Sequence, residues 1–232
     1  MGKTDEQFVQ GGNTIADELV RFVDLGPNST VFDLGCGYGR VAYALWARGH
    51  RARYVGIDIL PKAIGWCQEN MSPVTNGLYE FVLLDVENSR YNPNGTVRGD
   101  QVTFDLDFQP DVVVATSVFT HLYPTTVQRY LHEISRLLDT SGRVMATFFL
   151  INDSQQSCED EGRSPYPLDN ELTAFSRFWK LDNPLHVIGY KQDWVVEEAN
   201  AAGLSVESIH LGSWCGRQDA EVYQDTLILR RS

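Results

Sequence analysis

The chain has 232 residues, of which 43% are hydrophobic and 22% are charged, as is ordinary for a globular protein that buries one large core. Its 19 basic and 31 acidic residues give a net charge of −12, which argues against a protein that grips nucleic acid through its whole surface. The four cysteines form no C-x-x-C pair, no signal peptide begins the chain, and the longest apolar run is too short to span a membrane. We therefore expect a reduced, cytoplasmic protein without a transmembrane segment.

The first half of the chain alternates between predicted helices and strands. An amphipathic helix carries Ile15, Leu19, Phe22 and Val23, and Pro27 ends it. A strand over 30–34, a glycine-rich turn over 35–39 and a helix to about residue 48 follow. A strand over 53–57 ends at Asp58, a helix covers 61–70, and a strand over 79–84 ends at Asp85.

Two irregular segments interrupt this rhythm in the second half. Residues 86–109 are expected to be an inserted loop, after which come a strand over 111–115, a helix after Pro124 and a strand over 143–150. Residues 152–190 form the second insertion, with a short helix expected over 171–180. A helix from 192 to 203 leads to strands over 204–210 and 221–230, which should pair antiparallel because a loop joins them.

These elements predict an α/β fold with helices on both faces of a mostly parallel sheet, and one domain over 1–232 with insertions at about 86–109 and 152–190. Ligands of such sheets bind beyond the carboxyl ends of the strands. The chemistry should therefore lie just after residues 34, 58, 85, 116 and 150.

The turn after the first strand is an acid-x-G-x-G-x-G pattern made of Asp33, Gly35, Gly37 and Gly39. Glycines at every second position let a ligand approach the backbone closely. Arg40 stands where a dinucleotide-binding turn would have its third glycine, and no P-loop lysine follows, so a ligand without phosphates is favoured over a nicotinamide cofactor.

Two strand-end acids extend this pattern. Asp58 could accept hydrogen bonds from both hydroxyls of a ribose, and Asp85 could bind the amino group of an adenine while the backbone of Val86 contacts the ring. An ordinary strand-end residue is the alternative for Asp58, and a loop cap is the alternative for Asp85.

Five segments, 31–40, 56–59, 84–86, 111–122 and 141–144, resemble in order the motifs of class I S-adenosylmethionine-dependent methyltransferases. The resemblance spans about residues 15–151 and the last two strands. It implies a Rossmann-like, seven-stranded, mostly parallel sheet whose last strand is antiparallel, and S-adenosyl-L-methionine as cofactor with S-adenosyl-L-homocysteine as product. It places Asp33, Gly35, Cys36, Gly37 and Gly39 at the methionine end of the cofactor. It places Asp58 at the ribose and Asp85 at the adenine. Ile59, Val86 and Thr116 are further candidates for cofactor binding.

The end of the fourth strand bears on the methyl acceptor. It lacks the Asn/Asp-Pro-Pro-aromatic motif of enzymes that methylate amino groups of DNA and the Pro-Cys nucleophile of cytosine-C5 enzymes, so no nucleic acid is expected. No cluster of acids follows residue 115, so no metal is expected. Segments 116–122, 212–217 and 223–225 are similar to those of bacterial methyltransferases of sugars and other small molecules. We predict methyl transfer to a hydroxyl of a small molecule, sugar or glycolipid precursor. The alternatives are N-methylation of a small amine and a non-catalytic cofactor-binding protein.

His121 is the candidate general base, because an alcohol must lose its proton to a base; a packing or capping role is the alternative. Residues 152–190 are expected to form a lid or wall over the acceptor, in a monomer or homodimer. Five side chains are candidates for substrate binding, with core packing, turn formation or plain surface exposure as alternatives: Tyr123, Asp153, Tyr166, Trp214 and Arg217.

Overall fold

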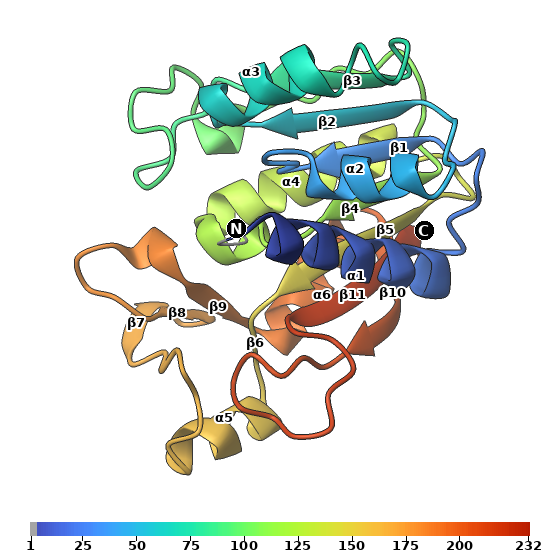
Figure 1. Ribbon diagram of the computed structural model, residues 1–232. Helices are drawn as coiled ribbons and strands as arrows, with labels where there is room; N and C mark the ends of the chain where they lie inside the picture. Colours follow the sequence, from blue (N-terminus) through green and yellow to red (C-terminus); the bar gives the residue numbers. More distant parts are fainter. Residues whose placement is uncertain (1–3) are drawn as a thin grey trace.

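The main sheet of the computed structural model, which describes residues 4–232, has seven strands in the order β10-β11-β5-β4-β1-β2-β3 (Figure 1). Strands β1 to β5 are parallel neighbours, whereas β11 runs antiparallel to both β5 and β10. This confirms the predicted Rossmann-like sheet. The strands are β1 (Val31–Leu34), β2 (Tyr54–Asp58), β3 (Tyr79–Leu83), β4 (Val112–Ala115), β5 (Arg143–Phe148), β10 (Leu204–His210) and β11 (Asp225–Arg231).

Helices cover both faces of this sheet because successive side chains of each strand point to opposite faces. Phe32 belongs to a core shared with α4 (Pro124–Leu137) and α6 (Gln192–Ala201). The adjacent Val31 belongs to a second core shared with α1 (Asp5–Val23), α2 (Arg40–Ala47) and α3 (Pro61–Asn70). The chain is therefore doubly wound, with one helical layer on each face (Figure 1).

A second, smaller sheet lies within the 152–190 insertion and beside it. Its strand order is β6 (Leu150–Ile151), β9 (Ile188–Lys191), β8 (Ser176–Phe178) and β7 (Asn170–Thr173). The insertion also contains α5 (Asp153–Asp160) and the 3₁₀ turn η3 (Pro184–His186). In the view of Figure 1 this sheet and α5 lie below the main sheet.

The predicted helix over 171–180 is wrong, since β7 and β8 form an antiparallel hairpin there. The turn is closed by a 2.7 Å hydrogen bond between the hydroxyls of Thr173 and Ser176, and β9 pairs with the other edge of β8. Apolar side chains at helical spacing favoured a helix, but pairing with a strand distant in sequence overrode the local preference.

The predicted strand over 143–150 is divided in two at Phe149. The carbonyl of Phe149 accepts a hydrogen bond from the amide of Tyr190, and the amide of Leu150 donates to the Asp225 carboxylate at 2.8 Å. The backbone therefore leaves the main sheet and enters the smaller one. The last strand begins at Asp225 rather than at 221, because residues 221–224 belong to the loop that returns to the carboxyl edge.

The 86–109 insertion is mostly irregular. It holds one 3₁₀ turn, η1 (Gly99–Gln101), and isolated bridges that join Val86 to Val97 and Asn88 to Asn92. A further 3₁₀ turn, η2 (Phe119–His121), follows β4. Both insertions therefore begin at the carboxyl edge of the sheet, where a ligand is expected.

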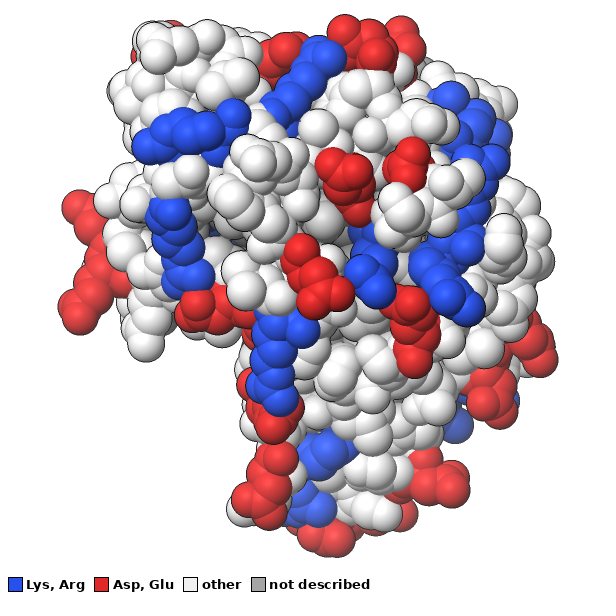
Figure 2. Space-filling model, turned by 90° about the vertical axis from the view of Figure 1, so that its right-hand side faces the viewer, with Lys and Arg blue, Asp and Glu red and all other residues white. Residues whose placement is uncertain are grey.

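The opposite edge of the sheet carries basic and acidic side chains that alternate over its surface (Figure 2). Arg53 contacts Asp107 at 2.7 Å, and Arg143 contacts Glu207 at 2.9 Å. Basic side chains on this face are thus paired with nearby acids and do not form a continuous basic patch. Among residues 4–232, no helix is long and apolar enough to cross a membrane.

Candidate cofactor and acceptor site

A cavity of about 560 Å³ opens at the carboxyl edge of the main sheet, a size within the usual range for small-ligand sites. Its walls come from the ends of β1, β2 and β4, from one face of α1 and from the loop before β11. Of the predicted cofactor and catalytic residues, seven line it: Gly35, Cys36, Gly37, Asp58, Ile59, Thr116 and His121.

The glycine turn has the backbone conformation that its sequence requires. Gly35, Gly37 and Gly39 have φ angles of 78°, 55° and 74°, which side-chain-bearing residues rarely adopt. A Cβ added to Gly35 would lie 2.5 Å from the Val118 side chain, whereas one added to Gly37 would meet nothing within 4 Å. Gly37 thus presents bare backbone on the open side of the turn.

Asp58 joins the glycine turn to the end of β2. Its Oδ2 accepts a hydrogen bond from the amide of Gly37 at 2.7 Å, and its Oδ1 accepts one from the amide of Leu60 at 2.9 Å. Burial raises the pKa of this carboxyl, while the backbone donors oppose that shift. Each oxygen keeps a second lone pair, so the carboxylate can still accept bonds from a ligand in the cavity.

Asp33 lies behind the turn and does not line the cavity. Its side chain faces the core and is 1% exposed, and one oxygen accepts a hydrogen bond from the hydroxyl of Tyr54. Burial raises the pKa of Asp33 to about 7. The structure therefore gives this acid a role beneath the turn rather than at the wall of the site.

Asp85 is also absent from the cavity wall. Its exposed carboxylate accepts hydrogen bonds from the Thr96 hydroxyl at 2.6 Å and from the Asn92 amide at 3.4 Å. The inserted loop folds back over the end of β3 and supplies these donors. This is the loop-cap arrangement that stood as the alternative to adenine binding for Asp85.

Val86 and Tyr123 line a neighbouring cavity of about 450 Å³, which shares Ile59, Asn88, Leu122 and Tyr130 with the main one. Gly39 lies at the start of α2, where a Cβ would come within 3.1 Å of the Cys67 sulfur, and it is not part of either wall.

A polar cluster joins the ends of β4, β5 and β11 inside the main cavity. The Ser117 amide donates to the Thr147 hydroxyl at 2.8 Å. The hydroxyls of Ser117 and Thr147 both donate to the Gln224 carbonyl oxygen, at 2.9 and 2.6 Å. Since that oxygen accepts two hydroxyls, the NH₂ group of Gln224 remains as a donor. Ser117 has a φ of 58°, a strained conformation that is often found at functional sites.

His121 is held between the two insertions. Its Nδ1 lies 3.0 Å from the carbonyl oxygen of Leu185. Its backbone carbonyl accepts a hydrogen bond from the side-chain amide of Asn88 at 3.2 Å. A carbonyl can only accept, so Nδ1 carries the proton of the neutral ring and Nε2 keeps its lone pair. Burial, with help from nearby Arg90, lowers the pKa of His121 to about 4, so the ring is neutral at pH 7.

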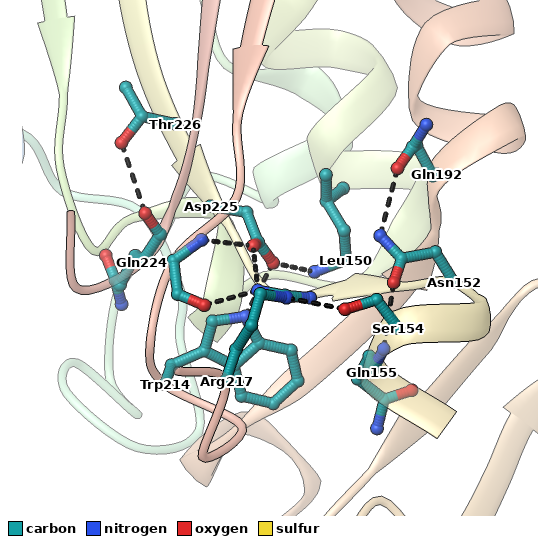
Figure 3. Close-up of polar contacts among 11 residues, drawn as sticks. Leu150, Asn152, Ser154, Gln155, Gln192, Trp214, Arg217, Gln224, Asp225 and Thr226 are labelled. Atoms are coloured by element: carbon teal, nitrogen blue, oxygen red, sulfur yellow. Dashed lines mark hydrogen bonds and ion pairs between the residues drawn. The ribbon is translucent and has the colours of Figure 1, made fainter. Parts of the chain in front are cut away.

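Asp225 forms a buried hub that is not part of the cavity wall, and the side chain of Gln224 points away from it (Figure 3). Its oxygens accept bonds from the amides of Leu150 and Gly212 at 2.8 and 2.7 Å and from the Trp214 indole at 2.5 Å. Arg217 lies 3.1 Å from the same carboxylate. Burial raises the pKa of Asp225 even though all of these donors lower it.

The hub accounts for two of the residues predicted to bind substrate. Trp214 is 0% exposed and stacks on Phe149 with ring centroids 4.1 Å apart, which is core packing. Arg217 donates to the Ser154 hydroxyl at 2.8 Å as well as pairing with Asp225 (Figure 3). Arg217 joins the 152–190 insertion to the loop before β11, and both residues lie outside the cavity walls.

Two of the substrate-binding candidates, Asp153 and Tyr166, belong to the 152–190 insertion and also lie off the cavity. Asp153 begins α5, with the preceding Asn152 as the cap of that helix. The Tyr166 ring packs edge-on against Trp179, and its hydroxyl lies 3.3 Å from that of Tyr223, which does line the cavity. Tyr166 therefore reaches the site only through another residue.

Two parts of the wall were missed from the sequence: the inner face of α1, and the Ser117–Thr147 pair. The pair of glycines at 11 and 12 within an otherwise regular amphipathic helix was an available signal for the first part. The second part depends on the strained conformation of Ser117 and on contacts between distant strands, neither of which has a local signal. Gln224 lay in a segment that carried the family resemblance.

A family model described as a methyltransferase domain matches residues 32–144. Among solved structures, a 1,6-didemethyltoxoflavin-N1-methyltransferase from Burkholderia thailandensis aligns with a TM-score of 0.60 and 16% identity, over 98% of this chain and 80% of that one. The magnesium protoporphyrin IX methyltransferase of Synechocystis aligns with a TM-score of 0.60 and 18% identity, over 100% and 90%. A TehB-like methyltransferase from Corynebacterium glutamicum gives 0.57 and 15%, over 95% and 88%. At these identities the structural likeness shows the fold alone.

Proposed function

Since this chain is a class I S-adenosylmethionine-dependent methyltransferase, we propose that it transfers the methyl group to a hydroxyl of a small molecule, sugar or glycolipid precursor. We propose further that it acts as a single-domain cytoplasmic enzyme, which four buried cysteines with free thiols support. The observation that carries the choice of a hydroxyl is the neutral imidazole of His121 in the cavity wall, with Nδ1 bonded to a carbonyl.

The residues of the cavity fit S-adenosylmethionine. Gly37 offers bare backbone in the left-handed conformation, and Asp58 keeps lone pairs for the two ribose hydroxyls. Ile59 and Leu84 supply apolar surface for a flat base. This cofactor supplies a methyl group that its sulfonium has already activated, so the protein has mainly to hold and align the acceptor.

In this proposal His121 receives the proton of the acceptor hydroxyl at Nε2. The carbonyl of Leu185 fixes the tautomer, so that the nitrogen with the lone pair is Nε2. The same carbonyl would stabilise the imidazolium that forms when Nε2 accepts the proton, because the Nδ1–H bond strengthens with the positive charge. Leu185 belongs to the 152–190 insertion, none of whose residues lines the main cavity, so the insertion would position His121 rather than cover the site.

Gln224 is proposed to orient the acceptor through its NH₂ group. The hydroxyls of Ser117 and Thr147 occupy its oxygen and thereby set the direction of the amide. An oxygen atom of the acceptor would accept a hydrogen bond from this NH₂ group. The strain at Ser117 supports a functional role for this cluster.

The test is a S-adenosylhomocysteine release assay with paired alcohols and amines that share one carbon skeleton: sugars with amino sugars, and phenols with anilines. We expect product from the alcohol of at least one pair, and a loss of about 10²-fold or more in that rate when His121 is replaced by alanine. Product from the amine alone would replace the proposal by N-methylation. S-adenosylmethionine binding without product from any pair would favour a non-catalytic binding protein.

A further inference from the structure

One face of α1 forms a wall of the cavity. Gly11, Thr14, Ile15 and Glu18 line it at helical spacings of three and four residues. The helix lies close against the start of α2 because Gly12 has no side chain: a Cβ there would lie 2.3 Å from the Arg40 carbonyl oxygen. A Cβ on Gly11 would be 3.6 Å from Nη1 of Arg40, so the guanidinium lies alongside this glycine.

Two ionisable side chains in this wall lack a hydrogen-bonding partner among residues 4–232. Glu18 and Arg40 both line the cavity, yet neither makes a hydrogen bond or an ion pair within the part of the chain that the structure describes. Burial raises the pKa of Glu18 to about 7, against the lowering effect of Arg40. A half-buried acid without a donor is costly, and a bound cation would remove that cost. Arg40 in turn can bind a carboxylate.

Other acids near the turn are already engaged. Asp58 accepts two backbone bonds, and its position at the end of β2 suits the ribose. Asp33 is turned into the core toward Tyr54 and is closed off from the cavity. Neither of these two acids is therefore free to serve as the charged partner of an ammonium group at the amino-acid end of a cofactor.

We propose that Glu18 and Arg40 form the subsite for the amino-acid end of S-adenosylmethionine, with the ammonium bound by Glu18 and the carboxylate bound by Arg40. The inference rests on the cofactor assignment that the proposed function also uses, but not on the nature of the acceptor. It makes α1 a part of the cofactor site, and it makes the glycines at 11 and 12 the reason why α1 can reach it.

Calorimetry with three ligands tests this division of roles. S-adenosylhomocysteine has both charges, its decarboxylated amine analogue has the ammonium only, and methylthioadenosine has neither. Glu18→Gln should weaken the first two by about 10- to 100-fold, and Arg40→Gln should weaken only the first, because a hydrogen bond to a charged group is lost in each case. Arg40→Lys keeps the charge and should recover part of the loss. Glu6→Gln, at an exposed position of the same helix, is the matched control and should change none of the three affinities.

Unchanged binding of methylthioadenosine shows at the same time that each variant is folded. Equal weakening of all three ligands, or of none, would overturn the proposal. A wild-type chain that binds none of them would overturn both this subsite and the cofactor assignment. If the three affinities change as expected but the protein methylates no hydroxyl, the subsite is supported and only the proposed function is wrong.

Discussion

The proposed cofactor half of the cavity, around Gly37 and Asp58, and its proposed acceptor half, around Ser117 and His121, are built in different ways. In the cofactor half, contacts such as that from Gly37 to Asp58 join the ends of adjacent strands that are 21 residues apart. In the acceptor half, Ser117 reaches Gln224 across 107 residues, and His121 reaches Leu185 across 64. The first half is a motif that one βα unit almost completes, whereas the second exists only when the insertions and the last strand are in place.

Because the acceptor half depends on contacts between distant segments, a substitution outside the cavity should lower the stability of the protein strongly. Asp225→Ala should lower the free energy of unfolding by about 3–5 kcal/mol, because it leaves Arg217 without its counter-charge and several buried donors unpaired. Urea denaturation measures this loss. Glu221→Ala is the control: it removes an ion pair with Arg21 in which both side chains are 59% exposed, and it should cost about 1 kcal/mol or less. Equal losses in the two variants would contradict the view that Asp225 is the hub.

Replacing His121, the proposed base, should affect turnover and leave cofactor binding intact. His121→Ala should lower kcat by about 10²-fold or more, with S-adenosylhomocysteine affinity unchanged. Because burial lowers the pKa of His121 to about 4, the base is unprotonated at neutral pH, and the wild-type rate should stay level between pH 6 and 8 and fall only toward pH 4. Stopped assays across this range measure it. A fall centred near pH 6.5 would mean that the ring is solvated and that Leu185 does not hold it.

A substitution at Asp58 should instead affect binding of the cofactor. Asp58→Ala should weaken S-adenosylhomocysteine binding by about a hundredfold, since two hydrogen bonds to a charged acceptor would be lost. Asp58→Asn keeps the size of the side chain but loses one of the two bonds from Gly37 and Leu60, because its NH₂ group cannot accept a hydrogen bond. Calorimetric affinities equal to that of the wild type in both variants would remove Asp58 from the ribose site.

A smaller effect is expected at the polar cluster. Gln224→Leu removes the NH₂ donor and should raise the acceptor KM by about tenfold, the cost of about one hydrogen bond, without changing cofactor affinity. Steady-state kinetics at saturating S-adenosylmethionine measures this change. Gln218→Leu, at an exposed position of the same loop, should leave KM as it is. A change confined to cofactor affinity would move Gln224 to the other half of the cavity.

The smallest effect should come from the acid that the sequence placed at the adenine. Asp85 is exposed and bonded to Thr96, so Asp85→Ala should alter S-adenosylhomocysteine affinity by about twofold or less. The same titration as for Asp58 gives the comparison. A loss as large as that for Asp58→Ala would show that the inserted loop moves away from Asp85 when the cofactor binds.

The two halves also differ in how far the sequence predicts them. The main sheet, its order of βα units and the glycine turn were foreseen, because hydrophobic periodicity and the φ requirements of glycine are local properties. The predicted helix over 171–180 was wrong, since β7 and β8 depend on pairing with β9.

The predicted substrate contacts illustrate the same limit. Trp214 and Arg217 were candidates for binding because aromatic and basic side chains often serve that purpose. Their place is decided by Asp225, which gathers donors from segments that are distant in sequence. No local pattern distinguishes a tryptophan that stacks on Phe149 from one that faces a ligand.

The central claim is that this cavity transfers a methyl group to oxygen. The most direct measurement uses S-adenosylmethionine with a ¹³C-labelled methyl group and an acceptor found in the paired screen, and records the carbon and proton shifts of the methyl group in the product. We predict a methyl ether signal that is lost in His121→Ala and kept in Asp85→Ala. An N-methyl signal from the same acceptor, or a methyl ether signal that His121→Ala leaves at full rate, would contradict the account.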